Sequence, residues 1–106
     1  MNVAYFDKEQ YDLENFKYLS RDIDEIDNLE CFQDSENFID YIRFNNVKLV
    51  FVGLDWELIK KIQEIDEKIA ISIITHDKKQ ALTAYQKGIF GYILKPYTSG
   101  DIRVVF

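Results

Sequence analysis

Short apolar runs alternate with amphipathic stretches along the whole chain. Five runs predict β-strands, at Val3–Phe6, Leu29–Phe32, Val47–Val52, Ile69–Ile74 and Ile89–Leu94. The third run, VKLVFV, combines branched and aromatic residues without regular polar alternation, which is typical of a strand buried on both faces. Turn-forming and polar residues separate the runs from the stretches that follow them.

Four of the intervening stretches have apolar residues at helical spacing. They contain Leu13, Phe16 and Leu19; Phe38, Ile39 and Ile42; Leu58, Ile59, Ile62 and Ile65; and Ala81, Leu82 and Tyr85. Asp34 and Asp77 are expected N-caps for the second and fourth of these helices, and Gly88 is expected to end the fourth. Thr98 and Ser99 predict the start of a fifth helix that the chain hardly continues.

Alternation of strands and helices with short connections predicts an α/β fold in which a parallel sheet is covered by helices on both faces. The length of 106 residues suits a single domain. In doubly wound sheets of this kind, functional residues lie beyond the carboxyl ends of the strands. We therefore expect the informative residues directly after each strand.

Composition narrows the classes of function. Apolar residues make up 47% and aromatic residues 15% of the chain, which indicates a packed core. The net charge of -6 argues against direct nucleic-acid binding. The single cysteine, Cys31, has no partner for a disulfide or a metal site, which favours a reducing cytoplasm. We expect no membrane segment, because no apolar run is long enough to span a bilayer.

Polar residues follow four of the predicted strands. They are Asp7 and Lys8, Gly53 and Asp55, Thr75 and His76, and Lys95 and Pro96. A lysine and a threonine hydroxyl around a carboxylate suit a phosphoryl group, because they supply a point charge and a hydrogen bond to its oxygens. His76 lacks a nucleophile partner and a second histidine, and we interpret it as a residue at the rim of the site.

The segment IAISIITHDKKQALTAYQKGIFGYILKPYT carries a resemblance to a known family. It resembles the receiver (CheY-like) domain of bacterial two-component response regulators, and the likeness extends over essentially the whole chain. Thr75, Gly88, Lys95 and Pro96 match residues of the family motif, and Tyr92 matches its aromatic switch position. The segment looks closest to receivers that precede LytTR-type DNA-binding domains in transcription regulators. The resemblance implies a flavodoxin-like sheet of order 2-1-3-4-5, with a truncated last helix, and typically a cis Lys95–Pro96 bond.

The chain departs from the family at the site of phosphorylation. Receivers accept phosphate on an aspartate that ends the third strand, with Mg²⁺ held partly by two acidic residues after the first strand. Here the second acidic position is Lys8, and the phosphoacceptor position falls on Gly53. Asp55, two residues further on, is the alternative phosphoacceptor. With Gly53 in that position, we expect Lys95 to contact Asp7, Asp55 or an inorganic anion rather than a phosphoryl group, and Lys8 to pair with Asp7 or Asp55.

Two functions remain open at this stage. The first is a degenerate receiver, neither an enzyme nor a metal protein, that signals through protein contacts in a phosphorelay-type pathway. The second is an active receiver that uses Mg²⁺ and Asp55 and controls a DNA-binding output domain, either fused or separate. Tyr85, Phe90 and Tyr97 lie on or beside the fourth helix and fifth strand, and are expected to form an interaction face that could support self-association.

Overall fold

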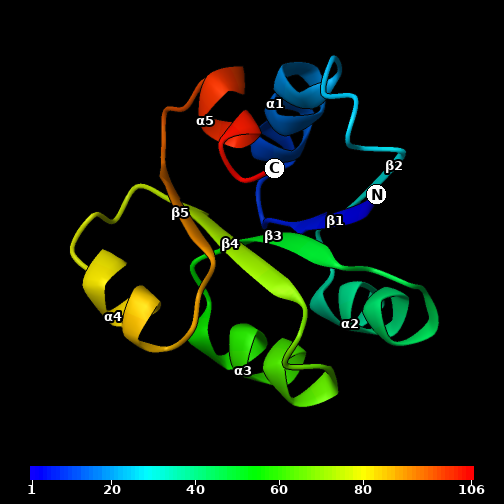
Figure 1. The fold of residues 1–106 in the computed structure, drawn as a ribbon, viewed down its shortest axis with the longest axis vertical. Coiled ribbons are helices and arrows are strands. Elements are labelled where there is room, and N and C mark those ends of the chain that lie inside the picture. The colour runs from blue at the N-terminus through cyan, green and yellow to red at the C-terminus, as the bar shows by residue number, and fades with distance from the viewer.

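Five strands and five helices alternate along the chain in the structure, a computed structural model that describes residues 1–106 (Figure 1). The strands are β1 (Asn2–Phe6), β2 (Asn28–Phe32), β3 (Leu49–Gly53), β4 (Ala70–Thr75) and β5 (Gly91–Leu94). The helices are α1 (Gln10–Ser20), α2 (Ser35–Phe44), α3 (Trp56–Ile65), α4 (Ala81–Gln86) and α5 (Ser99–Arg103). Every predicted strand and helix is present, although several ends are shifted.

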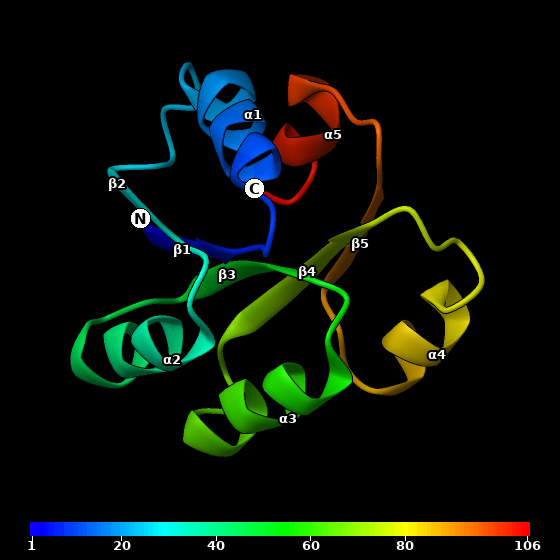
Figure 2. The ribbon, with the colours of Figure 1, turned by 180° about the vertical axis from the view of Figure 1, so that it is seen from behind.

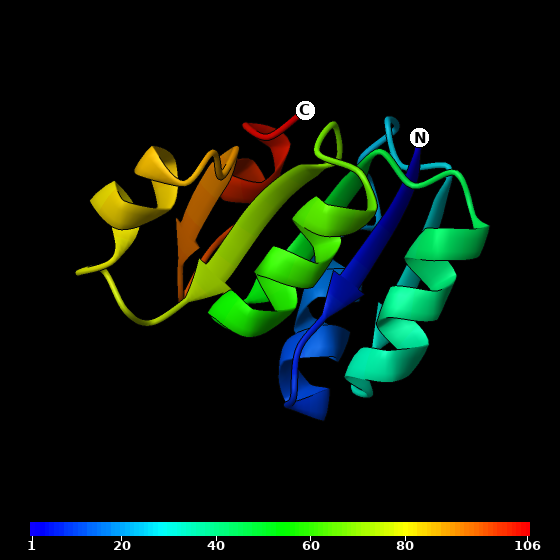
Figure 3. The same cartoon turned by 90° about the horizontal axis from the view of Figure 1, so that it is seen from below.

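The strands form one parallel sheet in the order β2-β1-β3-β4-β5. This confirms the predicted doubly wound topology, in which the chain adds strands first on one side of β1 and then on the other. Figure 3 shows the arrowheads of β1, β4 and β5 directed toward the same edge of the sheet. The residues that follow the strands therefore meet along this edge.

Helices cover both faces of the sheet. Figures 1 and 2 show α1 and α5 on one face and α2, α3 and α4 on the other. Val3 and Tyr5 of β1 pack toward α1 and α5, whereas Ala4 and Phe6 belong to the core on the opposite face. Successive side chains of a strand point to opposite faces, so a strand between two helical layers must be apolar throughout.

Three of the predicted helix ends are confirmed by their hydrogen bonds or backbone angles. The Asp34 carboxylate accepts hydrogen bonds from the first backbone amides of α2. Thr98 and Asp101 form a capping box at the start of α5. Gly88 follows α4 with φ of +83°, a backbone conformation that side chains disfavour, and this conformation ends the helix.

None of the helices is both long and apolar enough to cross a membrane.

The start of α4 differs from the prediction. Asp77 does not cap the helix: its carboxylate accepts a hydrogen bond from the Lys79 amide within the preceding loop, at 2.8 Å. The helix begins at Ala81 and is so short that it packs through Ala84 alone. Leu82, which helical spacing placed on the packed face, is therefore 70% exposed.

Candidate functional site

A cavity of about 370 Å³ opens at the carboxyl ends of β1, β3 and β4. It brings together nearly all the polar residues that the sequence predicts for the site. Its lining includes Asp7, Lys8, Gly53, Asp55, Thr75, His76 and Lys95. The position of the cavity follows from the topology, because it lies beside the point where the order of the strands reverses.

Asp7 is the buried carboxylate of this cavity, with 6% of its surface exposed. Its Oδ2 atom accepts hydrogen bonds from the Tyr5 hydroxyl at 2.8 Å and from Lys95 Nζ at 3.1 Å. Its Oδ1 atom accepts a hydrogen bond from the Glu9 amide at 3.3 Å. Both oxygens are therefore engaged by groups of the protein itself.

Lys95 bridges two carboxylates. Besides Asp7, its ammonium contacts Asp12 Oδ2 at 2.9 Å, and the three side chains are between 9% and 16% exposed. The predicted contact with Asp7 is present, the alternative contact with Asp55 is not, and Asp12 was missed. Asp12 lies in α1 rather than directly after a strand, so the search for residues at strand ends could not find it.

The pKa of Lys95 reflects this environment. Burial lowers the pKa of the ammonium, but the hydrogen bonds to Asp12 and Asp7 outweigh burial and raise it above its ordinary value. The Lys95–Pro96 peptide bond is cis, as the resemblance implied. We refer to Asp7, Lys95 and Asp12 below as the ion triad.

Tyr5 supports the triad from the core and was also missed by the sequence analysis. It is fully buried, its ring packs on Phe16 with the ring centroids 4.7 Å apart, and its hydroxyl donates to Asp7. Burial, followed by the negative charge of Asp7, raises the pKa of the Tyr5 hydroxyl far above its ordinary value. The Tyr5 hydroxyl therefore keeps its proton and donates a hydrogen bond to Asp7 at neutral pH.

Lys8 does not form the predicted ion pair with Asp7 or Asp55. Its side chain is exposed and takes part in no salt bridge. The reason is the triad: Lys95 already neutralises Asp7, so a second ammonium gains nothing by approaching it. Only the backbone carbonyl of Lys8 is used, as an acceptor for Gln33 Nε2 at 3.1 Å.

Gly53 lies at the end of β3, beside Asp7. The register pairs Phe6 with Val52, and a Cβ atom added to Gly53 would lie 3.6 Å from Asp7 Oδ2, an ordinary van der Waals distance. A Cβ atom at position 53 would therefore point toward Asp7 without a clash. Asp55 also lines the cavity, but its carboxylate caps α3 by accepting a hydrogen bond from the Leu58 amide at 3.1 Å.

Thr75 and Tyr92 both bind the loop between β4 and α4. Thr75 Oγ1 accepts a hydrogen bond from the Asp77 amide at 3.2 Å, and the Tyr92 hydroxyl donates to the Asp77 carbonyl. Burial, followed by the charge of Asp77, raises the pKa of Tyr92. His76 is exposed at the rim of the cavity, where the sequence analysis placed it. The two hydroxyl groups thus fix the loop.

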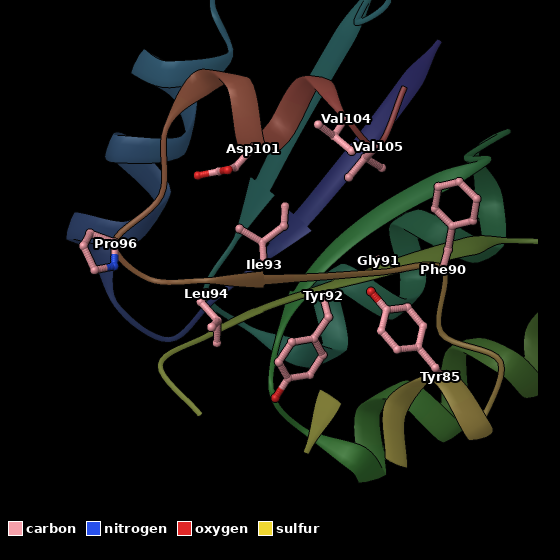
Figure 4. Close-up of a pocket in the computed structure, with 10 residues that line it drawn as sticks. All are labelled: Tyr85, Phe90, Gly91, Tyr92, Ile93, Leu94, Pro96, Asp101, Val104 and Val105. Atoms are coloured by element: carbon pink, nitrogen blue, oxygen red, sulfur yellow. The ribbon is translucent and has the colours of Figure 1, made fainter. Parts of the chain in front are cut away.

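A second cavity, of about 580 Å³, lies over the outer edge of β5 (Figure 4). Tyr85 and Phe90 line it and are 55% and 58% exposed, so both lie at the surface where the sequence predicts an interaction face. Tyr97 does not belong to this face. It is only 7% exposed, because the chain turns after Pro96 toward α1 and carries the ring into the core on that side.

The side chains of the first cavity show whether it can bind the Mg²⁺ ion that the resemblance implies. Asp7 is held by Tyr5 and Lys95, the next residue is a lysine, and Asp55 caps a helix. Nowhere in residues 1–106 do three aspartate, glutamate, histidine or cysteine side chains converge closely enough to hold a metal ion. These residues do not fit an octahedral Mg²⁺ site, which needs free carboxylate oxygens.

Comparison with solved structures identifies the fold. The response regulatory domain of protein mrkE from Klebsiella pneumoniae aligns with a TM-score of 0.85 at 23% identity, covering 99% of this chain and 91% of that one. The isolated REC domain of RcsB from Salmonella enterica serovar Typhimurium, determined in the presence of phosphomimetic BeF3-, aligns with a TM-score of 0.84 at 22% identity. The alignment covers 96% of this chain and 82% of that one. The chemotaxis response regulator CheY4 of Vibrio cholerae aligns with a TM-score of 0.79 at 13% identity, and the alignment covers 98% of this chain and 97% of that one.

The fold is therefore that of response regulator receiver domains, as the resemblance predicted. No family model matches the chain, and no curated protein sequence matches it either. The identities lie below the range in which residue roles can be transferred from a neighbour. What this chain does at its cavity must be argued from its own side chains.

Proposed function

We propose that the chain is a degenerate receiver domain that signals through protein contacts, without Mg²⁺-dependent phosphorylation of an aspartate. It needs no cofactor under this proposal and is not an enzyme. The setting we propose is the cytoplasm, as part of a two-component-type pathway. An output domain, fused or separate and of the DNA-binding LytTR type, would contact its surface.

The observation that supports the proposal is that a glycine, Gly53, lies beside the ion triad at the place where a phosphoacceptor aspartate would be expected. Position 53 lies against Asp7 at the end of β3 and has no carboxylate to receive a phosphoryl group. Lys95, which in the family contacts the phosphoryl group, is neutralised internally by Asp7 and Asp12. Phosphoryl transfer depends on cations that neutralise oxygen charge in the transition state, and here the cation and the carboxylates satisfy one another.

Asp55 supports the alternative, an active phospho-receiver that controls a DNA-binding output domain. Its side chain lines the same cavity as Lys95 and Thr75. To accept a phosphoryl group, however, it would have to release the Leu58 amide and leave the start of α3 without its cap. Loss of an N-cap costs about 1 kcal/mol of helix stability. Phosphorylation of Asp55 would therefore destabilise α3, whereas phosphorylation of an aspartate at position 53 would leave this cap in place.

Phosphorylation can be tested directly. The protein is incubated with acetyl phosphate and Mg²⁺, and in parallel with beryllium fluoride and Mg²⁺, and is then analysed by intact mass and by amide NMR spectra. We expect no phosphoryl adduct and no saturable spectral change. A stoichiometric adduct that disappears in Asp55→Asn would contradict the proposal and establish the alternative.

A gain-of-function variant provides the positive control. Gly53→Asp combined with Lys8→Asp restores a carboxylate at each of the two positions where the chain departs from the family. A Cβ atom at position 53 would meet the Asp7 carboxylate at an ordinary van der Waals distance. We expect this double variant to bind Mg²⁺ more tightly than the native chain, as measured by titration calorimetry. Equal Mg²⁺ affinity of the two proteins would show that these positions are not what prevents metal binding.

A further inference from the structure

The outer edge of β2 is a free edge of the sheet, on the side opposite β5. β2 pairs only with β1. The Phe32 carbonyl accepts a hydrogen bond from the Asp7 amide at 3.1 Å, so Phe32 directs its backbone groups toward β1. Because alternate residues of a strand direct these groups to opposite sides, the amides and carbonyls of Leu29 and Cys31 face outward. They form the row of unpaired donors and acceptors that an edge strand offers to another chain.

The helices hold β2 in place but leave this edge open. The side chains of Leu29 and Cys31 pack toward α1, whereas the Phe32 ring packs against Phe38 of α2 with the ring centroids 5.7 Å apart. Figures 1 and 2 show β2 at the margin of the sheet, with α1 over one face and α2 over the other. The strand is therefore already extended, and binding a partner strand would cost little free energy for ordering it.

The negative charge of the molecule is concentrated around this edge. Residues 22–42 contain eight carboxylates and no lysine, arginine or histidine, and all eight carboxylates are exposed. Four of them precede β2, Glu30 lies at the centre of the strand, and three follow it. The rest of the chain has a net charge of +2, although the whole chain carries -6. The β2 edge is therefore the acidic pole of the molecule.

Most of these carboxylates have no cationic partner. Salt bridges join only Asp22 to Arg21 and Asp27 to the N-terminal ammonium, so Glu30 is unpaired. A carboxylate at the centre of an edge strand opposes pairing with a like-charged strand and favours a cation opposite it. A second copy of this chain would bring its own Glu30 and acidic flanks to the same edge. The partner that fits is therefore a basic strand rather than another copy.

We propose that the outer edge of β2 binds an extended, basic segment of a partner protein as an additional strand. Backbone hydrogen bonds to Leu29 and Cys31 supply affinity. Lysine or arginine side chains at alternate positions of the segment meet Glu30 and the carboxylates at both ends of the strand, and an acidic segment is rejected by the same charges. The inference rests on the proposed function, because it assigns the chemistry of a partner through which a receiver without phosphorylation would signal.

The test uses a synthetic peptide of sequence VKVKVKV, acetylated and amidated at its ends, and the ¹⁵N-labelled protein. We expect saturable binding at low salt with a Kd below about 1 mM. Hydrogen exchange of the Leu29 and Cys31 amides should slow, while the amides of β5 at the opposite edge should not change. The peptide PKPKPKP has the same charge but cannot pair as a strand, because proline lacks the amide donor. It and the acidic peptide VEVEVEV should each bind at least roughly fivefold more weakly.

Matched protein variants separate charge at the edge from charge elsewhere. The double variant Glu25→Lys, Glu30→Lys should weaken binding of VKVKVKV at least roughly fivefold. The control double variant Glu64→Lys, Glu67→Lys makes the same change in net charge at two exposed glutamates in and after α3. This control should bind the peptide nearly as the native chain does, because its new lysines lie away from the β2 edge.

Several outcomes would overturn the inference. They are a Kd above about 1 mM for VKVKVKV, equal binding of VKVKVKV and PKPKPKP, equal losses in the two double variants, or unchanged hydrogen exchange at Leu29 and Cys31. A phosphoryl adduct in the acetyl phosphate experiment would overturn the proposed function and leave a positive peptide result standing. Absence of both the adduct and peptide binding would overturn the inference alone.

Discussion

At the scale of single residues, Lys95 has the largest influence on the candidate site. Its ammonium joins β5 to β1 through Asp7 and to α1 through Asp12, with little exposure of any of the three side chains. Removing one member of a buried ion pair leaves an uncompensated charge in a poorly solvated place, and this costs far more than the intact pair contributes. Lys95 is therefore a stability determinant, whatever the chain binds.

Replacement of this lysine gives a first prediction on stability. Lys95→Met should lower the free energy of unfolding by roughly 3 to 5 kcal/mol at pH 7, measured by urea denaturation. Lys8→Met, at an exposed lysine without a salt bridge, is the control and should stay within about 0.5 kcal/mol of the native value. Similar effects of the two replacements would contradict the importance of the triad.

The residues that sequence reasoning missed share a physical reason. The position of a residue in the chain indicates whether it follows a strand, and this was enough to predict that Asp7, Gly53 and Lys95 lie together. It does not indicate which carboxylate a long lysine side chain reaches, and in the structure Lys95 also contacts Asp12 of the neighbouring helix α1. Tyr97 was misplaced for a similar reason, because the direction of the chain after Pro96 is set by packing against α1.

At the scale of elements, apolar periodicity was a sufficient guide to the strands and the longer helices. These elements bury whole faces, so their patterns are strong. It failed at the start of α4, where six residues bury one small side chain and the capping residue has no distinctive pattern. The end of the same helix was predicted from one residue, Gly88, because a left-handed backbone favours glycine whatever surrounds it.

Gly88 allows a prediction at this scale. Gly88→Ala should destabilise the protein by about 1 kcal/mol, because alanine is strained at φ of +83°. Gly100→Ala provides the comparison: it lies within α5, and its new Cβ atom would meet Thr98 Oγ1 at an ordinary 3.5 Å. Alanine is the better helix former, so this change should be neutral or slightly stabilising. Thermal unfolding of both variants gives the two values, and equal losses would refute the assignment of strain to position 88.

At the scale of the whole molecule, the pKa values of five groups shift in one direction: those of Tyr5, Cys31, Tyr92, Lys95 and Tyr97 are all raised. Burial raises the pKa of the Tyr5 and Tyr97 hydroxyls, and the hydrogen bonds of the triad raise that of Lys95 despite its burial. A raised pKa means that the folded state keeps a proton that the unfolded state loses. Stability from these groups is complete below their unfolded pKa values, about 9 for Cys31 and near 10 for the others, and declines as pH rises above them.

The resulting prediction is alkaline sensitivity. The free energy of unfolding should be nearly constant between about pH 6 and 8, should begin to decline near pH 9 as the unfolded Cys31 thiol ionises, and should fall steeply above about pH 10. Tyr5→Phe loses one hydrogen bond at neutral pH but removes one of these groups, so its curve should fall less steeply. Urea denaturation at a series of pH values measures both proteins. Parallel curves for the two proteins would mean that Tyr5 ionises equally in the folded and unfolded states.

The space beside Asp7 at Gly53 also has a genetic consequence. A glycine codon becomes an aspartate codon by one base change, and the backbone at position 53 already accepts a Cβ atom at an ordinary distance. A lysine codon becomes a glutamate codon by one base change as well, which would return an acid to position 8. Both departures from the receiver pattern are thus a short mutational distance from reversal, and in the native chain Asp12 is a second carboxylate that binds Lys95.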